Sequence, residues 1–162
     1  MDLETLAVQV GDRLLRRGLM LATAESCTGG WVAQAITAVS GSSQWFERGF
    51  ITYSNAAKVE QLDVQAAILE QHGAVSEPTV RAMAEGALKH SHAQVAVAVS
   101  GIAGPGGGSL EKPVGTVCLA WAGGGMDTHA QCRMFLGNRE AVRRQAVATV
   151  LEGLLDRLRD QS

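Results

Sequence analysis

One stretch near the N-terminus is typical of a strand, a tight polar turn and a helix, and it constrains the fold most. An apolar run, Gly18-Leu-Met-Leu-Ala22, leads into Thr-Ala-Glu-Ser-Cys-Thr-Gly-Gly30, and an amphipathic run follows from Trp31 to Val39. At such a turn, backbone N–H groups at the helix N-terminus point outward and favour negative charge. The alternative is an ordinary cap, in which Ser26 or Thr28 satisfies those N–H groups.

The rest of the chain alternates helical and strand patterns. Apolar periodicity and cap residues predict further helices over about residues 3–17, 56–62, 64–72, 77–90 and 139–159. Runs of β-branched, aromatic and small residues predict strands over residues 44–53, 93–100, 113–122 and 128–136. Helices bracket the strands on both sides, so we expect an α/β fold: a three-layer α/β/α sandwich with a mixed central sheet, in a single domain over residues 1–162.

Composition excludes several classes of protein. The 162-residue chain is 46% apolar and carries a formal net charge of −2, so it lacks the basic surface that nucleic-acid binding needs. No apolar run reaches the roughly 18 residues of a membrane helix. The N-terminus, Met-Asp-Leu-Glu-Thr, is acidic where a signal peptide is basic. We therefore expect a cytoplasmic protein with no nucleic-acid or membrane partner.

The cysteines and histidines do not suggest a metal site. The three cysteines, Cys27, Cys118 and Cys132, are an odd number without a Cys-x-x-Cys pair, and we interpret them as free thiols. The histidines have no metal-ligand spacing with them. His90 and His92 lie near an expected helix end, where histidine suits the dipole.

Two more turns carry groups suited to chemistry. Lys58 falls in the first turn of an expected helix, where the helix dipole disfavours its charged form. The effect is worth about 0.3–1 kcal/mol, which lowers the pKa by less than one unit. A base active near neutral pH needs a larger shift, so burial must supply most of it; otherwise Lys58 is a solvated surface lysine. The second turn is Ser100 to Ser109, a glycine-rich loop after a buried strand. It does not fit the Walker A pattern, and it is either a ligand-binding loop or a flexible crossover.

Together the turns predict a hydrolytic site for an amide or ester. It would combine a hydroxyl nucleophile, a lysine base, a tyrosine donor and a glycine loop, because a Ser–Lys pair is a known alternative to Ser–His. Cys27 is a rival nucleophile, since a helix N-terminus lowers the pKa of a thiol. Four arginines could meet a phosphate, although a solvated helix face explains most of them equally well: Arg133, Arg139, Arg143 and Arg144.

Five motifs resemble, in order and spacing, those of the CinA C-terminal-domain family. They are Ala24-Glu-Ser-Cys-Thr-Gly-Gly30, Trp45-Phe-x-Arg-Gly-Phe-Ile-Thr-Tyr-Ser-Asn-x-x-Lys58, Gly73-Ala-Val-Ser76, Ser100-Gly-Ile-Ala-Gly-Pro-x-Gly-Gly108 and Lys112-Pro-Val-Gly-Thr-Val117. The likeness extends from about Leu6 to Leu158. Stand-alone members of that family are nicotinamide-nucleotide amidases, which convert nicotinamide mononucleotide and water to nicotinate mononucleotide and ammonia without a metal or cofactor.

The resemblance implies a role for each matching residue. Ser26 would be the nucleophile, Lys58 its base, and Tyr53 would assist proton transfer or hold the lysine. N–H groups around Thr28, Gly29 and Gly30 would stabilise the oxyanion. Substrate-binding residues are expected at Glu25, Thr28, Gly29, Gly30, Ser54, Asn55, Ser100, Gly101, Gly104, Gly106, Gly107 and Arg143.

The resemblance also implies a biological setting. The chain begins at the first helix of the family, so we expect a stand-alone amidase of pyridine-nucleotide salvage. Two alternatives stay open: a non-catalytic nucleotide-binding module of competence or damage-response machinery, and an amidase for another carboxamide such as nicotinamide. α/β enzymes of this size are often symmetric, so a homo-oligomer is compatible with the sequence.

Overall fold

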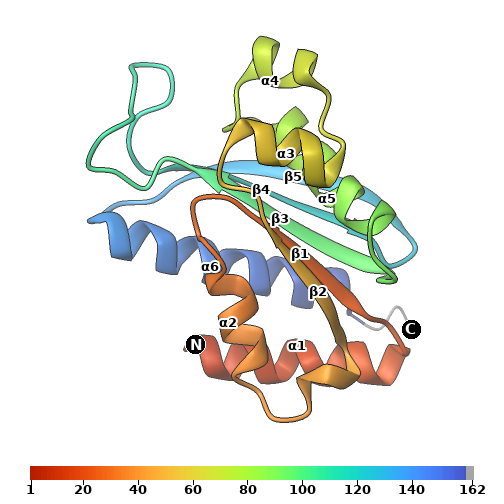
Figure 1. Cartoon of the computed structure of the whole chain (residues 1–162). Helices are drawn as coiled ribbons and strands as arrows, with labels where there is room; N and C mark the ends of the chain where they lie inside the picture. The colour runs from red at the N-terminus through yellow and green to blue at the C-terminus, as the bar shows by residue number, and fades with distance from the viewer. Residues whose placement is uncertain (160–162) are drawn as a thin grey trace.

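A computed structural model of the chain describes residues 1–159, in which five strands form one mixed sheet between two helical layers (Figure 1). The strands are β1 (Leu21–Glu25), β2 (Phe46–Ile51), β3 (Val95–Gly101), β4 (Thr116–Gly123) and β5 (Met126–Met134). Their order is β2-β1-β3-β4-β5; β1 pairs in parallel with β2 and β3, and the remaining pairs are antiparallel. The predicted three-layer α/β/α fold is confirmed. Residues 160–162 of the predicted domain lie outside the described residues.

Three helices cover each face of the sheet. On one face lie α1 (Leu3–Arg17), α2 (Trp31–Thr37) and α6 (Arg139–Arg157); on the other lie α3 (Asn55–Leu62), α4 (Ala66–His72) and α5 (Glu77–Lys89) (Figure 1). Their ends follow the predicted signals. Gly18 closes α1 with a φ of 65°, and the side chains of Ser54, Ser76 and Asn138 cap α3, α5 and α6.

The two faces of the sheet carry side chains of different size. Leucine and valine point toward α1, α2 and α6, whereas alanine alternates with them on the face under α5. The short side chains let α5 lie close to the sheet. At Gly86, α5 also approaches the end of α3, where a Cβ would collide with the carbonyl oxygen of Leu62. The contact fixes the position of α3, the helix that carries Lys58.

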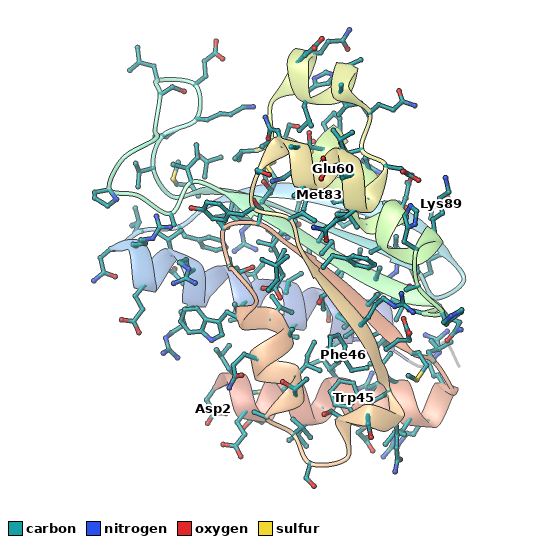
Figure 2. The ribbon with its side chains drawn as sticks, in the orientation of Figure 1. Asp2, Trp45, Phe46, Glu60, Met83 and Lys89 are labelled. Atoms are coloured by element: carbon teal, nitrogen blue, oxygen red, sulfur yellow. A yellow bond between two sulfur atoms is a disulfide. The ribbon has the colours of Figure 1, made fainter. Side chains whose placement is uncertain are left out.

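On the opposite face, an aromatic side chain fills the space between the sheet and the first helix. Trp45 lies beside α1 (Figure 2), and its indole occupies the space where a Cβ on Gly11 would stand. This packing anchors the chain just before β2.

Two of the three cysteines are not free thiols, so that expectation was wrong for them. Cys118 and Cys132 form a disulfide. The reason is register: the residues lie directly opposite one another in the antiparallel β4–β5 pair, with their Cα atoms 4.0 Å apart. Cys27 is free and buried. Among residues 1–159, no helix has the length and apolar character needed to span a membrane.

Candidate active site

The candidate site lies where the three parallel strands end. Ser26 follows β1, Thr52 and Tyr53 follow β2, and Gly101 ends β3. Carboxyl ends of neighbouring parallel strands meet at one edge of the sheet, where α/β proteins bind ligands. Backbone hydrogen bonds hold the three ends in register: Ser26 N–H donates to Val99 O at 2.9 Å, and Thr52 N–H donates to Glu25 O at 2.8 Å.

A serine and a lysine meet at this edge. Lys58 Nζ lies 2.9 Å from Ser26 Oγ, and it donates to the carbonyl oxygens of Thr52 at 2.7 Å and Tyr53 at 3.2 Å. A neutral amine has two N–H donors and one lone pair. Because the two carbonyls take both donors, the lone pair is left facing the serine hydroxyl. The geometry suits proton transfer from Ser26 to Lys58.

Burial tunes the lysine for that task. The Lys58 side chain is 0% exposed, and loss of hydration lowers its pKa from 10.5 to about 8. Within residues 1–159, no carboxylate oxygen lies within the 4.0 Å of Nζ that an ion pair requires. Burial thus supplies the shift that the helix dipole could not. Lys58 is not a solvated surface lysine.

Tyr53 contributes to this pair through its backbone. Its carbonyl oxygen accepts from Lys58 and also lies 3.4 Å from Ser26 Oγ. The phenol is 64% exposed, and its hydroxyl oxygen accepts from Arg139 Nη2 at 3.4 Å. The structure therefore places Tyr53 where it holds the lysine, with its phenol at the mouth of the site.

Glu25, expected to bind substrate, instead caps the helix behind the nucleophile. Its buried carboxylate accepts hydrogen bonds from the Thr28 hydroxyl at 2.6 Å and from the N–H groups of Gly30, Val32 and Ala33 at 3.2, 2.9 and 3.1 Å. These bonds satisfy the start of α2, a role that the sequence alone suggested for Ser26 or Thr28. Glu25 thereby fixes the turn that presents Ser26.

Substituting Glu25 tests this role. In Glu25→Gln, the amide cannot accept from all four donors and brings N–H groups of its own toward them. We expect the free energy of unfolding to fall by about 1–3 kcal/mol, measured by urea denaturation. Glu60→Gln, on the exposed side of α3, is the matched control and should change it by less than about 0.5 kcal/mol. Equal effects in the two variants would contradict the capping role.

Cys27, the rival nucleophile, is in the wrong state for attack. Burial raises the pKa of its thiol to about 11, and this outweighs the effect of the nearby Arg143 guanidinium. The expectation that the helix N-terminus lowers this pKa was wrong, because desolvation dominates and Glu25 already occupies the helix start.

The cavity at this edge has a volume of about 280 Å³. Eight predicted site residues line it: Ser26, Tyr53, Lys58, Ser100, Gly101, Gly104, Gly106 and Gly107. Seven others lie outside its lining: Glu25, Thr28, Gly29, Gly30, Ser54, Asn55 and Arg143. Ser54 instead caps α3.

Sequence reasoning missed several lining residues. It did not select Ala74, Val75, Ile102 or Ala103 as site residues, and it considered Arg139 only as one of four arginines that could meet a phosphate. Ala74 and Val75 belong to one of the motifs that carry the family resemblance, so that motif was a usable signal. Arg139 directly follows the cap of α6, and the sequence offered no way to rank it above Arg143.

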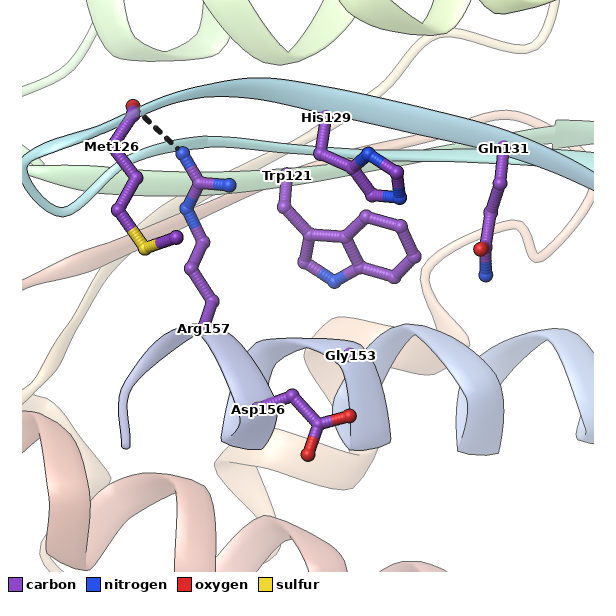
Figure 3. A pocket seen from close by; sticks show the side chains of 7 residues that line it. All are labelled: Trp121, Met126, His129, Gln131, Gly153, Asp156 and Arg157. Carbon is purple, nitrogen blue, oxygen red and sulfur yellow. Dashed lines mark hydrogen bonds between the residues drawn. The ribbon is translucent and has the colours of Figure 1, made fainter. Parts of the chain in front are cut away.

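A cavity of about 320 Å³ lies elsewhere, between the β4–β5 hairpin and the end of α6 (Figure 3). Trp121 and His129 stack there, and Arg157 donates to the carbonyls of Gly123, Met126 and Asp127. The guanidinium thus braces the hairpin turn. Within residues 1–159, the lining of this cavity contains no hydroxyl nucleophile and no lysine, so the candidate active site is the smaller cavity, which holds the Ser26–Lys58 pair.

The chain is similar over most of its length to two bacterial amidohydrolases. The chain is 58% identical over 156 residues to the nicotinamide-nucleotide amidohydrolase PncC of Escherichia coli K12, covering 94% of this chain and 93% of that protein. It is 56% identical over 151 residues to the protein of the same name from Pseudomonas putida, covering 93% and 94%.

A solved structure agrees at the level of the fold. The crystal structure of a competence/damage inducible protein, CihA, from Agrobacterium tumefaciens superposes with a TM-score of 0.94 at 46% identity, covering 98% of this chain and 97% of that one. The family model described as the CinA C-terminal domain matches residues 3–158. The chain belongs to the CinA C-terminal domain family.

Proposed function

We propose that the protein is a nicotinamide-nucleotide amidohydrolase, which hydrolyses the carboxamide of nicotinamide mononucleotide to give nicotinate mononucleotide and ammonia. The observation that carries this proposal is the buried Ser26–Lys58 pair, 2.9 Å apart in a cavity suited to a small ligand. The names of relatives more than half identical to the chain supply the substrate.

The first half of the reaction forms an acyl-enzyme. Ser26 Oγ attacks the carboxamide carbon while Lys58 Nζ takes the hydroxyl proton. The tetrahedral intermediate then expels its amine, which leaves as ammonia after receiving the proton from Lys58. A nicotinoyl ester on Ser26 remains. In the second half, Lys58 removes a proton from water, the resulting hydroxide attacks the ester, and the carboxylate product leaves as Ser26 regains its proton.

Backbone N–H groups beside Ser26 suit the developing oxyanion. The expected donors included Gly29 and Gly30, but these already donate to Ser26 O and to the Glu25 carboxylate. Within residues 1–159, the N–H groups of Cys27 and Thr28 donate to no other residue. We assign the oxyanion to these two donors, each worth about 2.7–4 kcal/mol at comparable sites.

Ammonia release tests the proposed function. Wild-type protein should release ammonia from nicotinamide mononucleotide, with nicotinate mononucleotide identified as the other product, and should act far more slowly on free nicotinamide. Release from nicotinamide at an equal rate would favour an amidase for another carboxamide. No release from either substrate by folded protein would favour the non-catalytic nucleotide-binding module, for which a buried nucleophile and base serve no purpose.

A further inference from the structure

The cavity at the sheet edge has two chemically distinct ends. One end holds Ser26 and Lys58. At the other, Arg139 faces the glycine loop, and Lys58 and Arg139 are the two charged side chains in the lining. Among residues 1–159, no carboxylate lines the cavity. Since Lys58 belongs to the catalytic pair, Arg139 is the cation in this lining that can bind an anionic group of the ligand.

Arg139 is held in place without being neutralised. Its Nη1 donates to Gly104 O at 2.8 Å, and its Nη2 donates to the Tyr53 hydroxyl oxygen at 3.4 Å. Both acceptors are neutral, and in the described part of the chain no carboxylate oxygen lies within 4.0 Å of the guanidinium. A guanidinium has five N–H donors, so three remain for a ligand. Such a fork matches the geometry of a phosphate.

The loop beside Arg139 offers further donors. The N–H groups of Gly106 and Gly107 form no hydrogen bond within residues 1–159, and both residues line the cavity. Gly107 has a φ of 92°, a conformation that glycine adopts without strain. Successive free backbone N–H groups favour an anion.

We propose that Arg139, with the N–H groups of Gly106 and Gly107, binds the phosphate of the substrate and so selects a nucleotide over the unphosphorylated nucleoside. This inference rests on the proposed function and assigns the substrate group at the far end of the same cavity. The carboxamide then lies at Ser26, and the apolar side chains of Val75 and Ile102 also line the cavity.

Arg143, which the sequence suggested for this task, is already committed. Its Nε donates to Cys27 O at 3.0 Å and its Nη2 to Thr28 O at 3.2 Å, while its guanidinium packs over the Trp31 ring. It therefore braces the turn that carries the nucleophile, and it does not line the cavity. Loss of Arg143 would disturb catalysis, whereas loss of Arg139 would disturb phosphate recognition.

The test compares two substrates in two variants. Arg139→Gln should raise KM for nicotinamide mononucleotide about 10- to 100-fold with kcat within a few-fold of wild type. Its kcat/KM for nicotinamide riboside, which lacks the phosphate, should stay within about twofold of wild type. Arg144→Gln is the matched control, because Arg144 lies on the same helix, is exposed and pairs with Glu140. It should leave all these constants unchanged.

A binding measurement keeps this inference separate from the proposed function. Calorimetry with ribose 5-phosphate should show binding to wild type and to Arg144→Gln, and its loss in Arg139→Gln, whether or not ammonia is released. If wild type deamidates the nucleotide but Arg139→Gln keeps its KM, the phosphate assignment is overturned and the amidase stands. Ribose 5-phosphate binding that survives in Arg139→Gln overturns the assignment in the same way.

Discussion

Replacing Ser26 with alanine is expected to lower kcat for ammonia release from nicotinamide mononucleotide by about 10³- to 10⁶-fold. The methyl group removes the oxygen that forms the acyl-enzyme, and Lys58 is left without a hydroxyl to deprotonate. The substrate should still bind, because the Arg139 end of the cavity is untouched. The measurement is steady-state ammonia release, with ribose 5-phosphate binding as a check that the site is intact.

The neighbouring cysteine provides the matched control. Cys27→Ala removes a thiol that burial keeps protonated, with its pKa raised to about 11, so kcat should stay within about tenfold of wild type. Ser26 and Cys27 are adjacent in the sequence, and the activities of the two variants show which of them is the nucleophile. If Cys27→Ala were inactive while Ser26→Ala kept its rate, the nucleophile would be the thiol and the proposed chemistry would be wrong.

Much of the fold could be predicted because its signals are local. The cap residues Ser54, Ser76 and Asn138 and the closing Gly18 act within one helical turn, so the sequence marks those helix ends directly. Strand ends were less accurate. The predicted strand over residues 44–53 is longer than the observed β2, Phe46–Ile51. Residues 42–44 form a 3₁₀ turn, and the Thr52 carbonyl accepts from Lys58 at the site.

The disulfide depended on register, which composition does not reveal. Cys118 and Cys132 are equally distant in sequence from Gly125, which lies in the turn between the two strands. An antiparallel hairpin that folds back at this turn therefore places the two cysteines opposite one another. The total of three cysteines is an odd number and suggested free thiols. Counting residues outward from the turn would have paired Cys118 with Cys132.

The candidate site was only half predictable, because its remaining features depend on burial and direction. The motif identified Lys58 but not its full burial, which needs α3 docked on α5 at Gly86. The sequence placed Glu25 in the turn but could not show that its carboxylate points back into α2. Likewise, Arg143 lies four positions after Arg139, and only the position of α6 shows which of them lines the cavity.

Replacing Lys58 should nearly abolish activity. In Lys58→Arg the guanidinium stays protonated and cannot accept the Ser26 proton, so kcat/KM should fall by about 10³-fold or more. Lys58→Met removes the amine while retaining similar bulk and should lose activity to the same extent. The exposed Lys89→Arg, on α5, is the matched control and should retain the wild-type rate.

The thermal stability of Lys58→Met shows whether its loss of activity comes from the missing base or from unfolding. The folded-state pKa of Lys58, about 8, lies below its ordinary value of 10.5, so the folded chain binds fewer protons than the unfolded chain as pH rises between these values. Stability due to this group therefore rises through that window, and below it the buried charge costs about 3 kcal/mol. Lys58→Met escapes this cost, although it leaves the carbonyls of Thr52 and Tyr53 without a donor. Its thermal midpoint at pH 7 should be no lower than that of wild type.

The same pKa sets the pH dependence of wild-type catalysis. Only the neutral amine accepts the Ser26 proton, so kcat/KM should rise about tenfold per pH unit below about pH 8 and level off above it. The profile should be measured with nicotinamide riboside as well, because the phosphate of the nucleotide also titrates, near pH 6. A rise in kcat/KM with pH that is seen with both substrates comes from a group on the enzyme, not from the substrate phosphate. A flat riboside profile between pH 6 and 9, or a Lys58→Arg variant within tenfold of wild type, would remove Lys58 as the base and leave it a structural brace for the carbonyls of Thr52 and Tyr53.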